Sequence, residues 1–434
     1  MPPVLFTADV VLPMSGPPLP DGGVLVEGER IAAVGEADRL RRDAARVHHV
    51  DGALLPALVN GHAHLEHSDA AQLARAGPQH VWLQAIEGLT GTWDAERWER
   101  SARRGVLENL RAGAATVIDV VTRGPAVPAA SRAGLAGSSV VAIDEVDLTD
   151  VDEVLPALAH ALRLPSDGRR VGVAPSAPYR LGTGVLQALG DLAARDQVPL
   201  QIHAAQTAAE VTAIREGDGP LAEHARARGL QFEWLDGGTG LTPVRYLDAC
   251  KLLRPSTSIV GGATTDVLEA RLLAERGTAV VCTPRSNVLL GIAPLPLERF
   301  ADAGVALALG TESAGCSPDA DLLAEAAAWV ALARERGLAL WPSSVGPVSL
   351  EEQAVRLLTC DGAQALGWGH RSGLLEPGRR ADLLGVALPI SAGSAYADLV
   401  AGGAGRQVLT VVAGVRRSRR ADADAPWPEL DRER

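Results

Sequence analysis

The hydrophobic pattern is most regular in the middle of the chain. Between residues 56 and 371, short runs of aliphatic and β-branched residues alternate with longer stretches in which apolar residues recur every three or four positions. Such runs are typical of buried strands, and such stretches are typical of amphipathic helices. We expect eight strands, at residues 57–64, 115–121, 138–146, 171–176, 198–204, 256–261, 278–283 and 305–311. Helices are expected between them, among them residues 152–164, 185–195, 266–276 and 321–336.

This alternation determines the fold class that we expect. Eight strands that alternate with helices over about 250 residues are typical of a (β/α)8 barrel, which is an α/β fold. An open, doubly wound sheet is the alternative, but no GxGxxG turn follows the first of these strands. In a barrel, the functional side chains gather at the carboxyl ends of the strands.

The two ends of the chain are richer in strands and turns than in helices. Strand-like runs occur at residues 4–12, 23–35, 381–386 and 407–415. We expect residues 1–55 and 372–420 to form one small β-sandwich domain, beside a barrel domain of residues 56–371. Residues 421–434 are expected to be a loose polar tail.

Composition narrows the range of partners. The 434 residues carry 41 basic and 53 acidic side chains, a net charge of -12. A surface of this sign repels phosphate backbones and anionic lipids, so we expect a small-molecule partner and neither nucleic acid nor membrane. The four cysteines form no CxxC pair, and the N-terminus lacks the pattern of a signal peptide. Both observations favour the reducing cytoplasm.

Histidines stand at the ends of two predicted strands. His62 and His64 are two residues apart, so their side chains leave the first strand on the same face. His203 ends the fifth strand and could complete three protein ligands for a divalent metal, with one position left open for water. The alternative is that these are core or turn histidines without a metal. We expect His67, His80, His160 and His224 to lie on exposed helices or loops.

The eighth strand brings a carboxylate to the same rim. Glu312 follows the apolar run at 305–311 and could bind the metal and accept a proton from its water. Its alternative role is that of a helix cap or a surface acid.

Several segments, taken in order, resemble one family. They are PALVNGHAHLE at 56–66, QIHAAQ at 201–206, LTPVRYLD at 241–248, CTPRSN at 282–287, ALGTES at 308–313 and GLLEPGRRADLL at 373–384. They are similar to the amidohydrolase superfamily, in the branch of triazine hydrolases and S-adenosylhomocysteine deaminases, with 6-aminodeoxyfutalosine deaminases nearest. The resemblance implies a homodimeric enzyme that deaminates an aminopurine-type nucleoside, as in menaquinone biosynthesis. It also implies one divalent metal, zinc first, with iron or manganese as alternatives.

The resemblance also implies roles for individual residues. His62, His64 and His203 match the family's metal-binding histidines, and Glu312 stands where the family has an aspartate. Gln206 replaces the glutamate that shuttles protons, and Gly261 and Ser176 stand where the family has histidines. Trp82 is expected to stack on the substrate ring. The other candidate substrate contacts are Glu66, Ser176 and Arg285.

These departures leave two functions open. A glutamine amide does not exchange a proton near neutral pH, so Gln206 is no general acid or base, and Glu312 is the remaining catalytic base. The chain is therefore either an aminohydrolase or a catalytically degenerate paralogue that binds a metal or ligand without hydrolysis. A third possibility is hydrolytic loss of another leaving group. If the scaffold is a decayed deaminase, the triple change Gln206→Glu, Gly261→His and Glu312→Asp should raise deaminase activity.

Overall fold

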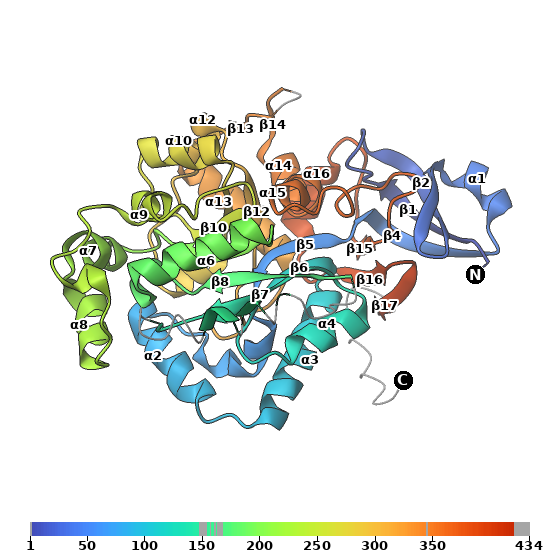
Figure 1. Cartoon of the computed structure of the whole chain (residues 1–434). Coiled ribbons are helices and arrows are strands. Elements are labelled where there is room, and N and C mark those ends of the chain that lie inside the picture. The colour runs from blue at the N-terminus through green and yellow to red at the C-terminus, as the bar shows by residue number, and fades with distance from the viewer. Residues whose placement is uncertain are drawn as a thin grey trace.

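The computed structural model describes residues 2–146, 154–156, 158–159, 162, 168–343 and 346–420. The helix expected at 152–164 and the tail at 421–434 lie largely or wholly outside these residues. Two sheets organise the described chain, an eight-stranded one in the middle and a seven-stranded one built from both ends (Figure 1). No helix of the described residues has the length and apolar character needed to cross a membrane.

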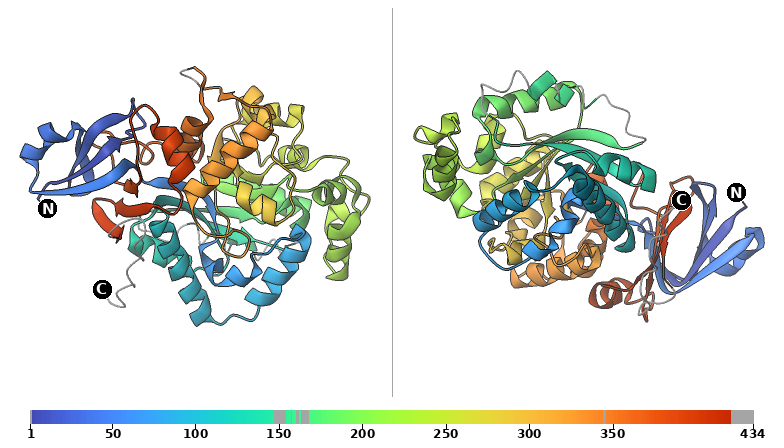
Figure 2. Two further views of the ribbon diagram at one scale, coloured as in Figure 1. Left: turned by 180° about the vertical axis from the view of Figure 1, so that it is seen from behind. Right: turned by 90° about the horizontal axis from the view of Figure 1, so that it is seen from below.

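The eight-stranded sheet is parallel and follows the order of the sequence. Its strands are β5 (Leu58–Ala63), β6 (Ala114–Val121), β7 (Ala136–Ile143), β8 (Arg170–Pro175), β9 (Leu200–Ala204), β10 (Thr257–Gly261), β11 (Ala279–Cys282) and β12 (Leu307–Leu309). Each overlaps one of the eight strands expected from the hydrophobic pattern. The ring closes beyond β12, where the N–H groups of Thr311 and Glu312 donate to the carbonyl of His62 at 3.0 and 3.1 Å. The predicted (β/α)8 barrel is thus confirmed, and Figure 2 shows the strands encircled by helices.

Helices cover the outside of the barrel. They are α2 (Gln79–Thr90), α3 (Ala95–Arg111), α4 (Ala126–Ala133), α6 (Thr183–Arg195), α7 (Ala208–Glu216), α8 (Gly219–Ala227), α9 (Pro243–Ala249), α10 (Val267–Arg276), α11 (Pro284–Leu289), α12 (Leu297–Ala303), α13 (Leu322–Glu335), α14 (Leu350–Leu357) and α15 (Cys360–Ala365). The helices expected at 185–195, 266–276 and 321–336 are confirmed as α6, α10 and α13. Asp266 begins α10 in a capping box with Glu269, which explains why the helix starts there.

The two chain ends form the second sheet together. Its order is β17 (Val415–Arg419), β16 (Gln407–Val412), β15 (Leu383–Ala387), β4 (Arg46–Pro56), β1 (Val4–Val11), β2 (Leu19–Glu27) and β3 (Arg30–Glu36). The expected small β domain from both ends is present, and its strands are hydrogen bonded into one continuous sheet with a core of its own. Two short helices, α1 (Ala37–Leu40) and α16 (Ala395–Gly402), and a hairpin of β13 (Leu340–Trp341) and β14 (Val348–Ser349) complete the described elements.

A buried carboxylate fixes the turn that follows β6. Glu66 lies in a 3-10 segment, Leu65–Leu73, directly after β5, and its side chain is fully buried. Its two oxygens accept the backbone N–H groups of Thr122, Arg123, Gly124 and Ala126 at 2.7–3.1 Å. These donors have no strand partner at this position, so the Glu66 carboxylate replaces the hydrogen bonds that water would otherwise make.

We expect Glu66→Gln to destabilise the fold. An amide offers one acceptor oxygen instead of two and turns an NH2 group toward backbone donors, and each buried donor without a partner costs about 1–3 kcal/mol. The free energy of unfolding measured in urea should fall by roughly 2–4 kcal/mol. Glu99→Gln is the matched control, since Glu99 is exposed and only bonds Arg103. Equal loss in both variants would contradict this role of Glu66.

Candidate metal centre

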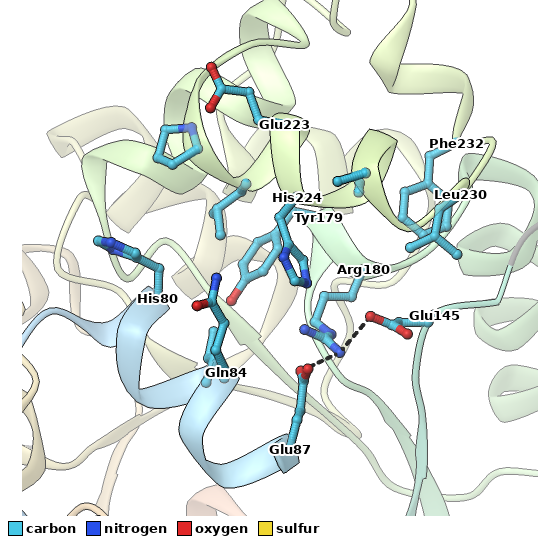
Figure 3. A pocket seen from close by; sticks show the side chains of 15 residues that line it. His80, Gln84, Glu87, Glu145, Tyr179, Arg180, Glu223, His224, Leu230 and Phe232 are labelled. Atoms are coloured by element: carbon cyan, nitrogen blue, oxygen red, sulfur yellow. Dashed lines mark hydrogen bonds and ion pairs between the residues drawn. The ribbon is translucent and has the colours of Figure 1, made fainter.

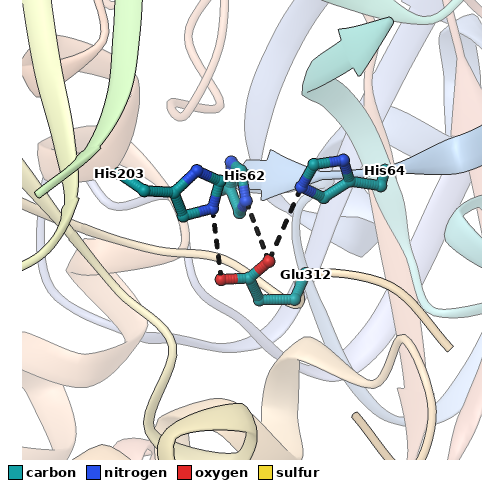
Figure 4. Close-up of side chains that lie close together, drawn as sticks. All are labelled: His62, His64, His203 and Glu312. Atoms are coloured by element: carbon teal, nitrogen blue, oxygen red, sulfur yellow. Dashed lines mark hydrogen bonds and ion pairs between the residues drawn. The ribbon is translucent and has the colours of Figure 1, made fainter. Parts of the chain in front are cut away.

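Three histidines and one glutamate meet at the carboxyl ends of the strands. His62 lies in β5, His64 directly after it, His203 in β9, and Glu312 follows β12. The Nε2 atoms of His62 and His64 lie 3.0 and 3.7 Å from Oε2 of Glu312. Nε2 of His203 lies 3.7 Å from Oε1 (Figure 4). The four potential ligand atoms are all within 4.8 Å of one another, so the His203 ring turns toward His62 and His64.

Hydrogen bonds on the far side of two rings determine which nitrogen faces the centre. Gln201 donates from Nε2 to Ser258 and to the Gly61 carbonyl, which leaves its Oε1 to accept from Nδ1 of His62 at 2.7 Å. Nδ1 of His203 likewise donates to the Ser176 carbonyl at 3.2 Å. Each neutral ring then directs the lone pair of Nε2 at Glu312. Bonds of this kind orient the ligand histidines of metal sites.

The side chains therefore direct hydrogen-bond acceptors at the centre, and none of them directs a hydrogen-bond donor there. Two imidazole lone pairs and a carboxylate, at separations of 3.0–3.7 Å, repel one another unless a cation or a proton lies between them. Three imidazoles and one carboxylate are a donor set that suits a divalent metal such as zinc. The residues present fit a single divalent ion, and His62, His64, His203 and Glu312 are the residues that would hold it.

The electrostatics agree with this donor set. Burial and the neighbouring ring of His62 hold the pKa of His64 well below the usual histidine value. Burial raises the pKa of Glu312, but the imidazoles of His62 and His203 outweigh it, so the pKa lies well below the usual glutamate value. For His203 burial lowers the pKa, yet the Glu312 carboxylate outweighs it and the net shift is upward. An ionised carboxylate is thus retained in a water-poor site.

The centre lies in the floor of a pocket of about 460 Å³. Trp82, from α2, and Tyr179, from the turn after β8, contribute aromatic walls. The indole Nε1 of Trp82 donates to the Gly315 carbonyl at 2.6 Å, which fixes the plane of the ring. The Gln206 side chain also lines the pocket, and its Oε1 accepts from Nε2 of Gln79 at 2.6 Å.

A second cavity of about 370 Å³ shares Glu87, Tyr179 and Arg180 with this pocket. Figure 3 shows Arg180 in it, beside Glu87 and Glu145. Arg180 pairs with Asp144 at 2.5 Å, Glu87 at 2.9 Å and Glu145 at 3.1 Å. Glu87, Glu145 and His224 are close enough together to hold an ion. Both glutamates are already paired with Arg180, and Glu145 also with Arg228, so this group is an ion-pair network and not a second metal centre.

The sequence matches one protein family over most of its length. The Amidohydrolase family model matches residues 53–416. The chain belongs to the amidohydrolase family. It is 33% identical over 322 residues to the aminodeoxyfutalosine deaminase of Deinococcus radiodurans, a match that covers 71% of this chain and 76% of the relative. It is 31% identical over 383 residues to a 5-methylthioadenosine/S-adenosylhomocysteine deaminase of Syntrophobacter fumaroxidans, covering 84% and 79%.

Solved structures of other amidohydrolases share the whole architecture. Helicobacter pylori aminofutalosine deaminase in complex with methylthio-coformycin aligns with a TM-score of 0.80 at 19% identity, covering 95% of this chain and 99% of that one. A zinc-bound adenosine deaminase from Xanthomonas campestris gives 0.76 at 24% identity, covering 95% and 92%. Similarity at this level of identity establishes the fold, and the family resemblance inferred from the sequence is confirmed by the family match.

The structure separates the other candidate residues into two groups. Trp82 and Ser176, two of the predicted substrate contacts, line the pocket, and so does Gln206, the residue at the position of the proton shuttle. Glu66 does not, because it is buried against the β6 turn with both oxygens occupied. Arg285 does not line it either: its guanidinium donates to Asp319 and to the Asp321 carbonyl ahead of α13. These two expected substrate contacts have structural roles instead.

His67 and Gln201 are pocket residues whose place was not expected from the sequence. His67 was expected on an exposed segment, but it lines the pocket and stacks on His64 with ring centroids 5.2 Å apart; burial lowers its pKa to about 4. Gln201 was not singled out, although its alternation with His203 along β9 places both side chains inside the barrel. Among the other histidines, His80 is exposed as expected, His224 is half-buried on α8, and His160 lies outside the described residues.

The backbone at Gly261 is incompatible with the histidine that the family resemblance implies for this position. Its φ is +119°, and an added Cβ would lie 2.5 Å from Cγ of Gln206 and 2.8 Å from the Ala204 carbonyl oxygen. L-residues rarely adopt this backbone conformation, and a carbonyl of the barrel wall cannot easily move. The triple substitution expected to restore a deaminase is therefore wrong in its Gly261→His component.

We expect His62→Ala and His203→Ala to abolish stoichiometric binding of a divalent metal. Each removes one of the four side chains that would hold the ion, and we expect the affinity to fall far enough for the ion to be lost on dialysis. The measurement is metal content after dialysis against zinc-buffered solution. His224→Ala should keep one equivalent, because the carboxylates beside it are paired with arginine. Loss of metal in His224→Ala with retention in His62→Ala would contradict the assignment of the site.

We expect Gln201→Met to weaken metal binding by roughly 10- to 100-fold, because the His62 ring loses the acceptor that fixes its tautomer. Competition with a chromophoric chelator measures the affinity. Gln353→Met is the control, since Gln353 is also buried but bonds Asp361 on the outer layer of helices. Unchanged affinity in Gln201→Met would show that the Gln201–His62 hydrogen bond has no part in metal binding.

Proposed function

We propose that this amidohydrolase is a metal-dependent aminohydrolase that deaminates an aminopurine-type nucleoside, similar to 6-aminodeoxyfutalosine. The observation that carries the proposal is the convergence of three imidazoles and one carboxylate in the floor of the pocket. Deaminases of adenosine-type compounds recur among the relatives, including a 5'-deoxyadenosine deaminase of Methanothermobacter thermautotrophicus. A small-molecule substrate, a homodimer and a cytoplasmic location belong to the same proposal.

His62, His64, His203 and Glu312 would hold the ion, with zinc preferred and iron or manganese as alternatives. A divalent ion in this position makes water acidic enough to serve as a nucleophile near neutral pH. Glu312 is the carboxylate among these four residues, and it would accept the proton that such a water gives up. Gln201 and the Ser176 carbonyl hold the His62 and His203 rings in the orientation required.

The pocket walls suit a flat heterocycle. Trp82 is fixed by its hydrogen bond to Gly315 and presents an aromatic face. His67 lies beside His64 in a neutral state and can donate one hydrogen bond to a bound ring. Gln206 has its oxygen engaged by Gln79, so its NH2 group is free to donate to a ring nitrogen or carbonyl.

One observation favours a second function, that of a binding protein without hydrolysis. Gln206 occupies the position of the family's proton shuttle, and an amide only makes a static hydrogen bond. General acid–base groups contribute roughly 100- to 10,000-fold in rate, so their loss could leave a site that binds but does not turn over. The carboxylate of Glu312, which lies among the three histidines, favours the enzyme over this alternative.

Ammonia release decides between the two functions. The zinc-loaded protein should liberate ammonia from at least one member of a panel of 6-aminopurine nucleosides with varied 5' substituents. Glu312→Gln should lower kcat at least 100-fold, because the proton acceptor and the ligand charge are both lost. No turnover across the panel, together with saturable binding of the same nucleosides to the zinc-loaded protein, would favour the non-catalytic function.

We expect Gln206→Ala to raise KM about 10-fold while kcat changes little, because the amide holds the ring but carries no proton. Steady-state kinetics on the best substrate of the panel measure both constants. Gln364→Ala is the control, since Gln364 lies on α15, outside the pocket. A large fall in kcat for Gln206→Ala at constant KM would contradict the static role assigned to this amide.

A further inference from the structure

A polar cavity of about 230 Å³ lies in the β domain and shares no lining residue with the metal pocket. His48, His49 and Asp51 line it from β4, and Arg416 and Arg419 line it from β17. Arg420, the next residue of the chain, completes the basic side. Figure 1 shows β17 and β4 at this end of the molecule, beside the barrel.

The sheet topology explains why a cavity exists here. β15 stands between β16 and β4, but it pairs with β4 only from Gly52 to Pro56 and ends at Ala387. Residues 46–51 of β4 extend beyond that end, and no described strand pairs with them on this side. The resulting notch lies between the start of β4 and the β16–β17 pair.

A β-bulge directs two arginines into this notch. Arg416 pairs with Val411 and Arg419 pairs with Leu409, although the two arginines are three residues apart, because the register shifts between Thr410 and Val411. The extra residue of the bulge puts both side chains on the same face of the sheet. Without the bulge, a spacing of three would place them on opposite faces.

Two of the arginines that line the notch have no counter-ion among the described residues. Within the described parts of the chain, neither Arg416 nor Arg419 nor the nearby Arg46 has an ion pair or a hydrogen bond, whereas many other arginines pair with carboxylates. Burial, followed by the positive charges of Arg416, Arg419 and Arg46, lowers the pKa of His48. The protein as a whole carries a net charge of -12, so this cluster of positive side chains has the opposite sign to the net charge.

We propose that the notch is a binding site for a small polyanion that carries phosphate-type oxyanions. Guanidinium groups bind such oxygens bidentately, and the two forks of Arg416 and Arg419 face one cavity. Arg420 is anchored by donating to the Gln407 carbonyl at 2.7 Å and adds a third positive charge. Asp51 is the opposing group: its exposed carboxylate lies 3.4 Å from Nε2 of His49 and would weaken the binding of an anion.

Calorimetric titration of the full chain with inorganic pyrophosphate and, separately, with inorganic phosphate tests the proposal. Pyrophosphate should bind at one site, and more tightly than phosphate, because it spans both guanidinium groups. Arg416→Gln and Arg419→Gln should each weaken binding by roughly 10-fold, the effect of losing one charge-assisted contact. Asp51→Asn should tighten it, and deaminase activity should be unchanged in all three variants.

Arg417→Gln is the matched control, since Arg417 is the extra residue of the bulge and does not line the cavity. It removes the same charge from the same strand, so pyrophosphate affinity should stay within about twofold of the parent. The proposal is overturned if the parent binds no pyrophosphate, or if Arg417→Gln weakens binding as much as Arg416→Gln. An unchanged affinity in Asp51→Asn combined with an unchanged affinity in Arg419→Gln would also overturn it.

Discussion

The rest of the site depends on the imidazole lone pairs of His62 and His203, which point at the carboxylate of Glu312. Gln201 and the Ser176 carbonyl fix Nδ1 of two rings, so the opposite nitrogens face Glu312 with nothing to donate. A positive charge must occupy that space, and a divalent metal satisfies all four groups at once. The same residues close the barrel: the peptide of Glu312 bonds to the peptides of His62 and His64 where β12 meets β5.

Features of the fold and the site that follow from local sequence patterns could be predicted, whereas contacts between residues far apart in the sequence could not. The eight strands follow from hydrophobic runs, and parallel strands of a barrel end at one rim, so the convergence of His62, His203 and Glu312 was predictable. The role of Glu66 was not predictable, because the sequence near an HxH motif does not show whether an acidic side chain contacts substrate or backbone. The four amides that it accepts lie nearly sixty residues away, in a turn that only the tertiary structure places beside it.

The departures from the family pattern at positions 206 and 261 are physically coupled. The space where a side chain at Gly261 would begin is filled by Cγ of Gln206, and Gln79 holds the amide there from α2. A histidine on β10 and the observed position of Gln206 exclude each other. Position 261 therefore requires glycine as long as Gln206 and the Ala204 carbonyl keep their places.

Anomalous diffraction from crystals of the protein purified without chelators tests the metal centre most directly. X-ray fluorescence identifies the metal, and a difference map at its absorption edge locates it. The account predicts one peak per chain, at about 2.0–2.2 Å from Nε2 of His62, His64 and His203 and from a carboxylate oxygen of Glu312. A metal-free centre in crystals grown with excess zinc, or a peak whose ligands do not include these four residues, would contradict it.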